Sequence, residues 1–135
     1  MAIRVESLLR SIGLIDNFSK LIYVIAHGSS SANNPHHSAH DCGACSGRPG
    51  SVNARVFAFM ANHSKVRELL NSKGIKIPND TQFVGSLHDT ASDLIAYYDE
   101  HNLHDANIQL HSKNKIIFDN ALDNNAKERS RRFAS

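Results

Sequence analysis

The sequence has few of the features that assign a protein to a class at first sight. Its 135 residues include only two cysteines and carry a formal net charge of +2. Cys42 and Cys45 are three positions apart, too close to form a stabilising disulfide framework, so we expect free thiols and a reducing compartment. A charge this small also gives no reason to expect nucleic acid as a partner.

Long hydrophobic runs are also missing. The longest run, Leu21 to Ala26, is far shorter than the roughly 20 residues that cross a bilayer. The first turns of the chain, Met1 to Ser11, lack the apolar centre of a signal peptide. We therefore expect a soluble chain in which residues 1–135 form a single domain around one hydrophobic core.

Hydrophobic patterning predicts helices that alternate with strands. Leu21–Ala26 is a continuous apolar run, typical of a strand covered on both faces in a parallel sheet. The other expected elements are helices at 5–12, 51–72 and 113–133 and strands at 81–90 and 93–99. This order predicts an α/β fold, a layered sandwich whose small, mostly parallel sheet is incomplete.

Some details of the helices can also be predicted. Ser51 is the expected N-cap of the long helix, and His63 falls on its apolar stripe as a packing residue. In the last helix, Ile116 and Ile117 are expected among the few apolar anchors.

The segment from His27 to Gly50 holds four of the nine histidines and both cysteines. His27 follows the first predicted strand, and ligands of open α/β sheets bind beyond the carboxyl ends of the strands. The loop after it is rich in Gly, Ser, Asn and Pro and is long enough to return Cys42 to the same point. Imidazole and thiolate are preferred zinc ligands, so His27 and Cys42 are candidate ligands of Zn²⁺.

Two ligands do not complete a zinc site, which takes three or four from the protein. The candidates for the others are Cys45, His40, His36 and His37, or residues outside this chain. Each loop histidine has the alternative of simple exposure to solvent. His88, beside Asp89 at the end of another predicted strand, is a weaker candidate for the same sheet edge.

Cys42 and Cys45 also form a C-x-x-C pair, the pattern of a thiol redox site. Such a pair normally begins a helix, whose N-terminus acidifies the first thiol. Here Gly47, Pro49 and Gly50 delay the helix, so the pattern favours metal binding over dithiol chemistry.

Residues 26–55, AHGSSSANNPHHSAHDCGACSGRPGSVNAR, closely resemble the hallmark segment of the DabA-type inorganic carbon transporter subunits. FVGSLHDTASD from Phe83 and ERSRRF from Glu128 resemble later parts of the same family, although Ser46 stands where a glycine is more usual. The resemblance implies a β-carbonic-anhydrase-like core in which zinc is bound by a Cys and an Asp from an upstream segment and by a His and a Cys from this one. By motif, the latter two are His27 and Cys42.

The upstream Cys-x-Asp-x-Arg segment is missing from this sequence. The resemblance therefore implies a C-terminal fragment of a larger zinc protein, inactive alone. It implies that the complete protein hydrates carbon dioxide to bicarbonate while docked on a membrane-embedded, proton-conducting subunit related to the pump subunits of respiratory complex I. The expected location is peripheral, on the cytoplasmic side of the bacterial inner membrane.

Two further residues and one alternative belong to this hypothesis. Asp41 and Arg48 are candidates to orient a ligand or to neutralise bicarbonate, although surface or capping roles fit them as well. The alternative function is a self-contained structural zinc module for binding a partner, with Cys45 and one loop histidine completing the site.

Overall fold

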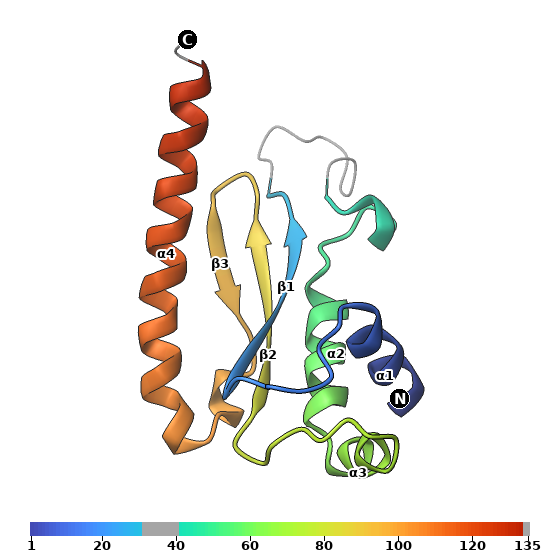
Figure 1. Ribbon diagram of the computed structural model, residues 1–135. Coiled ribbons are helices and arrows are strands. Elements are labelled where there is room, and N and C mark those ends of the chain that lie inside the picture. Colours follow the sequence, from blue (N-terminus) through green and yellow to red (C-terminus); the bar gives the residue numbers. More distant parts are fainter. Residues whose placement is uncertain (31–40, 134–135) are drawn as a thin grey trace.

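The computed structural model describes residues 1–30 and 41–133, and within them helices alternate with strands, as predicted (Figure 1). The helices are α1 (Ala2–Ser11), α2 (Ser51–Asn62), α3 (Ser64–Ser72) and α4 (Asp105–Phe133). The strands are β1 (Leu21–Gly28), β2 (Gln82–Asp89) and β3 (Leu94–Tyr97). Two short 3-10 turns are η1 (Gly43–Cys45) and η2 (Glu100–Asn102).

The three strands form one sheet in the order β1-β2-β3. β1 and β2 are parallel, in register from Leu21 beside Gln82 to Gly28 beside Asp89. β2 and β3 are antiparallel, so the expectation of a mostly parallel sheet is wrong and the sheet is mixed. The reason is the short connection over residues 90–93, which allows a hairpin but not the crossover that a parallel pair requires.

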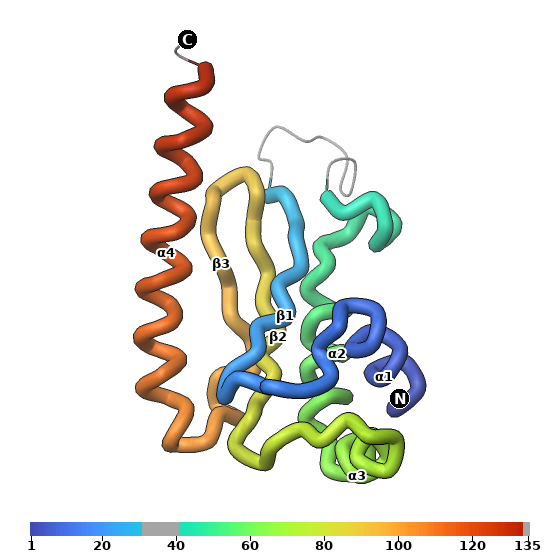
Figure 2. Tube along the Cα trace, viewed as in Figure 1, coloured from blue at the N-terminus to red at the C-terminus, as the bar shows by residue number. Residues whose placement is uncertain are grey.

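Helices cover the two faces of the sheet unequally. α1, α2 and α3 lie on one side, and α4 lies alone on the other (Figures 1 and 2). Side chains alternate along β1, so Ile22 and Val24 join the core beneath α2 whereas Tyr23 faces α4. The buried members of that core are Val5, Leu9, Ala58, Ala61, Val66, Leu70, Ile75 and Phe83.

The long helix predicted for 51–72 is broken at His63, which has extended backbone (ψ 127°) and caps the start of α3. Tertiary hydrogen bonds compensate for the break. Asn62 Nδ2 donates to the carbonyl oxygen of Phe83, whose N–H donates to Asn62 Oδ1, both at 2.8 Å. Arg67 Nε donates to the Ala61 carbonyl at 2.9 Å. The prediction of one continuous helix is therefore wrong, whereas His63 is half-buried as expected, with its ring against that of Phe59.

The ends of two helices also differ from the prediction. The residue that caps α2 is Gly50 and not Ser51, which is the first helical residue. α4 begins at Asp105 rather than near residue 113, because its first turns are anchored by buried polar side chains, Asn107 and His111. The apolar residues expected to anchor it do not: Ile116 and Ile117 are more than 60% exposed.

None of the helices among the described residues combines the length and the apolar composition that a bilayer-spanning segment needs.

Candidate functional site

The candidate site begins where β1 ends. His27 is an exposed residue of β1, and Gly28 after it is buried. The Gly28 carbonyl accepts hydrogen bonds from the N–H of Thr90 at 2.8 Å and from its hydroxyl at 3.0 Å. These hydrogen bonds hold the carboxyl ends of β1 and β2 together. His27 and His88 are the candidate site residues at these two strand ends.

The segment over residues 41–50 returns to the end of β1. Asp41 Oδ1 accepts a hydrogen bond from the Ser29 N–H at 2.5 Å, and the N–H of Gly50 donates to the His27 carbonyl at 2.9 Å. A Cβ at Gly50 would lie 2.8 Å from the Cβ of Ala26, so only glycine permits this approach. The return segment, residues 41–50, is therefore fastened to β1 at both of its ends.

Cys42 and Cys45 lie in a tight turn of the return segment. The Cys42 carbonyl accepts hydrogen bonds from the N–H groups of Cys45 at 3.0 Å and Gly47 at 2.9 Å. Cys42 is buried and forms a backbone bridge with Arg48, while Cys45 is half-buried with Asn53 Nδ2 3.3 Å from its sulfur. α2 begins after this turn, so the cysteines do not occupy the helix N-terminus that a redox pair would use.

The chemistry of Cys45 also disfavours a redox role. Its pKa is raised, first by a hydrogen bond with the Cys42 thiol and second by burial. A reactive thiol requires the opposite, a lowered pKa that supplies thiolate near neutrality.

The strand register shows which side chains share a face with His27. His27 is the direct partner of His88, so both lie on the face toward α4, whereas Gly28 and the contact with Asp41 lie on the opposite face. His88 Nε2 lies 3.2 Å from Asp93 Oδ1. His88, the weaker candidate, is therefore beside His27 but already paired.

Among residues 1–30 and 41–133, no three or more His, Cys, Asp and Glu side chains are grouped so that they could hold a metal ion. His27 and Cys42 have donor types that suit zinc, but two ligands alone do not make a zinc site. The other candidate histidines, His36, His37 and His40, lie outside the described residues.

Asp41 and Arg48 have different surroundings. The Asp41 carboxylate positions the return segment through Ser29, which is a structural role. The Arg48 side chain is exposed, and Arg48 contacts Cys42 through the backbone bridge between the two residues.

Sequence reasoning missed a polar network between the sheet and α4. His111 lies between the Tyr23 hydroxyl, 2.8 Å from Nδ1, and Glu100 Oε1, 2.7 Å from Nε2. Lys115 Nζ also contacts Glu100 Oε1 at 3.0 Å and is the main cause of the lowered pKa of Glu100. Burial raises the pKa of the neighbouring Tyr97 to about 12. His111 precedes the helix predicted for 113–133, and nothing in the sequence around it indicated that it would be buried.

Asp89 forms a second connection that was not predicted, at the carboxyl end of β2. It accepts hydrogen bonds from the Ser30 hydroxyl and from the Ser30 N–H, the latter at 3.0 Å. These bonds hold the pKa of Asp89 well below its usual range. The carboxylate thereby fixes the chain where it leaves β1.

Comparison with known proteins identifies the same family that the sequence motifs resemble. The family model described as "Probable inorganic carbon transporter subunit DabA" matches residues 1–135. Proteins named as probable inorganic carbon transporter subunit DabA are 60% identical over 133 residues in Azotobacter vinelandii and 54% identical over 138 residues in Nitrosospira multiformis. A relative of the same name in Methylococcus capsulatus is 47% identical over 133 residues.

The matches cover 98 to 100% of this chain but only 12 to 16% of these three relatives, so the chain spans a small part of their length. No solved structure matches it. With a match along its whole length, the chain belongs to the DabA family of probable inorganic carbon transporter subunits.

Proposed function

We propose that this chain is part of a zinc-binding subunit of an inorganic carbon uptake system, and that the complete protein hydrates carbon dioxide. The observation that carries the proposal is the return segment, which fastens the turn containing Cys42, through Asp41 and Gly50, to the backbone of Ser29 and His27. The printed names of the relatives, probable inorganic carbon transporter subunits, support the substrate class.

In this proposal His27 and Cys42 supply two zinc ligands on a β-carbonic-anhydrase-like core. The remaining ligands, a Cys and an Asp, come from the part of the full-length protein outside these 135 residues. Bound zinc would lower the pKa of water so that it adds to carbon dioxide near neutral pH, giving bicarbonate and one proton. The exposed guanidinium of Arg48 would attract the bicarbonate anion, and Asp41 would hold the return segment in place.

The proposed partner is a membrane-embedded, proton-conducting subunit related to the pump subunits of complex I. The word "subunit" in the names of the relatives supports an assembly of several chains. The complete protein would then be peripheral, on the cytoplasmic side of the bacterial inner membrane.

Metal analysis of the full-length protein tests the ligand assignment. Replacing both residues, His27→Ala with Cys42→Ala, is expected to reduce zinc from about one per chain to almost none, because a catalytic site has only three or four protein ligands. Cys45→Ser is the matched control, a thiol in the same turn that the proposal leaves out, and it should keep its zinc. Unchanged zinc in the double variant would refute the proposal.

A structural zinc module is the second candidate, and the tight turn that holds Cys42 and Cys45 together, with the Cys45 N–H 3.0 Å from the Cys42 carbonyl oxygen, favours it. There, both thiols, His27 and one loop histidine would bind one zinc within this chain. Cys45→Ser would then lose zinc as completely as Cys42→Ala. The 135-residue chain alone would also bind zinc tightly and lose its fold when a chelator is added.

A further inference from the structure

The sheet is covered unevenly on the side of α2. A helix with its side chains is about 10 Å wide and neighbouring strands are about 4.8 Å apart, so one helix covers roughly two strands. α2 packs on β2 and β1, and α4 contacts β3 and β1 from the other side. The face of β3 toward α2 is left bare: Leu94 is 66% exposed, and Ala96 is exposed as well.

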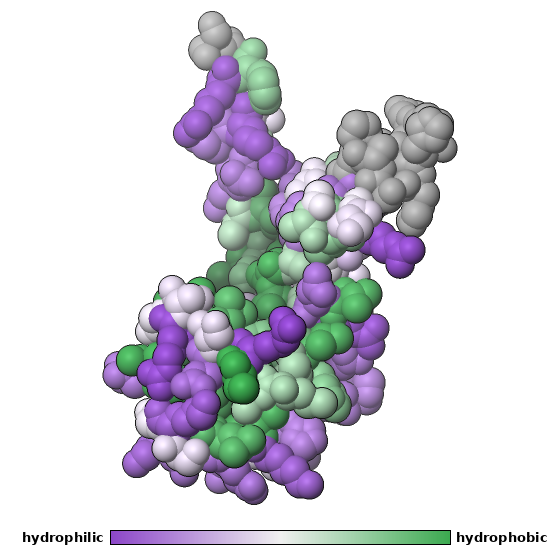
Figure 3. Space-filling view, turned by 90° about the vertical axis from the view of Figure 1, so that its right-hand side faces the viewer, coloured by the Kyte–Doolittle hydropathy of each residue, from purple (hydrophilic) through white to green (hydrophobic). Residues whose placement is uncertain are grey.

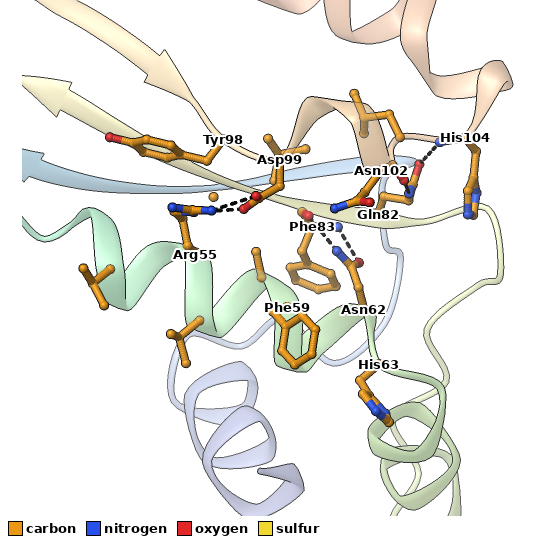
Figure 4. A pocket seen from close by; sticks show the side chains of 16 residues that line it. Arg55, Phe59, Asn62, His63, Gln82, Phe83, Tyr98, Asp99, Asn102 and His104 are labelled. Carbon is orange, nitrogen blue, oxygen red and sulfur yellow. Dashed lines mark hydrogen bonds and ion pairs between the residues drawn. The ribbon is translucent and has the colours of Figure 1, made fainter.

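A groove of about 660 Å³ lies between α2 and residues 98–104, the chain that leaves β3, with residues 82–85 of β2 along it (Figure 4). Its helical wall carries Val52, Val56 and Phe59, at positions i, i+4 and i+7 on one flank of α2. These side chains are 67%, 48% and 63% exposed. Apolar residues also cross the middle of the molecular face on the side of α1, α2 and α3 (Figure 3).

The polar groups of the groove are largely paired among themselves. Arg55 donates two hydrogen bonds to the Asp99 carboxylate, at 2.9 and 2.8 Å, and its guanidinium lies 5.2 Å from the centre of the Tyr98 ring. Figure 4 shows Arg55 and Asp99 pointing toward one another across the groove. Because this charge is neutralised within the chain, the groove favours an apolar occupant over a charged ligand. A buried polar atom without a hydrogen-bond partner among the described residues, His63 Nδ1, lies at one end.

We propose that an amphipathic helix from the part of the full-length family protein outside these 135 residues packs in this groove, beside α2. The relatives described above have 84 to 88% of their length outside the matched region, which provides the chain for such a helix. Packed 8 to 10 Å from α2, it would cover Val56 and Phe59 on one side and Leu103 on the other. Its polar face would meet solvent, and one hydrogen-bonding group near its end would pair with His63.

A second copy of this chain is a poorer occupant. A two-fold interface places the same patch of each copy against itself, which requires a self-complementary surface. A groove is concave and does not complement a second copy of itself. The proposal does not depend on zinc or on carbon dioxide hydration, because only the shape, apolar character and exposure of the groove support it.

Photo-crosslinking in the full-length protein tests the inference. A benzophenone amino acid at position 56 is expected to crosslink to a peptide of the same polypeptide outside residues 1–135, with the product at monomer mass. The matched control is position 117 on α4, also an exposed apolar site but on the opposite side of the sheet, which should not crosslink to that peptide. Crosslinks to a second copy, to another protein, or to no protein at all would overturn the proposal.

A smaller substitution, Val56→Cys, controls for misfolding caused by the bulky benzophenone side chain. In the full-length protein, Val56→Cys should react with a maleimide about tenfold more slowly than in the same protein unfolded in urea, since burial requires local opening before reaction. Equal rates would show an open groove and contradict the proposal. Zinc content is measured on the same sample, so a failed zinc assignment and a failed groove assignment are distinguished.

Discussion

Single glycines decide how closely the return segment and α2 approach the sheet. At Gly50 a Cβ would lie 2.8 Å from the Ala26 Cβ, and at Gly85 it would lie 2.8 Å from the Cα of Arg55. Neither position has the positive φ that favours glycine for conformational reasons, so the requirement comes from space alone. Ordinary van der Waals contact needs more than 3.4 Å, and one methyl group must therefore displace backbone.

Gly85→Ala is expected to destabilise the protein by about 1–3 kcal/mol, the usual cost of overpacking a close-packed contact. The measurement is the free energy of unfolding from urea titration followed by circular dichroism. Gly43→Ala is the control, because a Cβ there meets no atom within 4 Å. Equal stability of the two variants would show that α2 can move away from β2 without cost.

The Arg67 side chain compensates for the helix break at His63. Its guanidinium donates to the carbonyl oxygens of Ala61 at 2.9 Å and Thr81 at 2.7 Å, and burial lowers its pKa. Arg67→Met should cost about 2 kcal/mol or more, because hydrogen bonds from a charged donor are lost and buried carbonyls are left unpaired. Arg67→Lys should restore only part of this stability, since an ammonium cannot span the same carbonyls.

The lower free energy of unfolding of Arg67→Met would be measured by urea titration followed by circular dichroism. The exposed Lys65→Met in α3 is the matched control and should change stability by less than about 0.5 kcal/mol. A similar small change for Arg67→Met would mean that water replaces the guanidinium without penalty.

Carboxylates with a lowered pKa make the fold sensitive to acid. The pKa of Asp89 is lowered mainly by the Ser30 hydroxyl and N–H, and that of Glu100 mainly by Lys115. Each carboxylate binds a proton less readily in the folded chain than in the unfolded chain, so its contribution to stability is present above a pH of about 4 and is lost as the pH falls further. The free energy of unfolding is therefore expected to be level between about pH 5 and 7 and to decrease below about pH 4.

Urea titrations at several pH values check this expectation. Asp89→Asn should flatten the acid limb, because the amide keeps an acceptor for Ser30 but does not titrate. An unchanged slope in Asp89→Asn would show that its carboxylate gains nothing from Ser30.

At the scale of elements, the sequence predicted the strands better than the helices. Leu21–Ala26 is apolar throughout, and β1 was recognisable because both of its faces are covered. The break at His63 was not predictable from periodicity, because it depends on Asn62 reaching the backbone of Phe83 in a distant strand. The start of α4 was missed for the same kind of reason: Asn107 is buried by hydrogen bonds to Asp80 and Gln82, not by apolar character.

For the candidate site too, some residues could be predicted from the sequence and some contacts could not. His27 and Cys42 could be selected from residue type, spacing and the position of a strand end. The close contacts of Gly50 and the paired state of His88 could not, since they depend on coordinates of segments far apart in the sequence.

α4 is expected to be unequally stable along its length. Its buried residues, Asn107 and His111, are confined to the first turns, and the helix continues past the end of the sheet (Figure 1). In the distal part, Arg129 contacts Asp93, and no side chain there is buried. Isolated helical turns are marginal in water without packing.

Hydrogen exchange measured by mass spectrometry should therefore be faster for amides at 123–133 than for those at 105–118. Equal protection in the 135-residue chain would contradict this account of α4. Slow exchange of both parts only in the full-length protein would instead show that the rest of the protein covers the distal turns.

At the scale of the whole molecule, the chain corresponds to a small part of the length of its relatives. It has a core of its own, two candidate zinc ligands at one strand end, and a bare sheet face beside α2. Two candidate ligands are too few for a zinc site, and the face of β3 beside α2 is uncovered. Both features are explained if the rest of a full-length protein packs against these 135 residues.

X-ray absorption at the zinc edge of the full-length protein tests the central claim most directly. The account predicts a shell with two sulfur ligands at about 2.3 Å together with one imidazole. One sulfur should be lost in Cys42→Ser and both kept in Cys45→Ser. A shell that keeps both sulfurs in Cys42→Ser, or that contains no imidazole, would contradict the claim that this segment binds the metal.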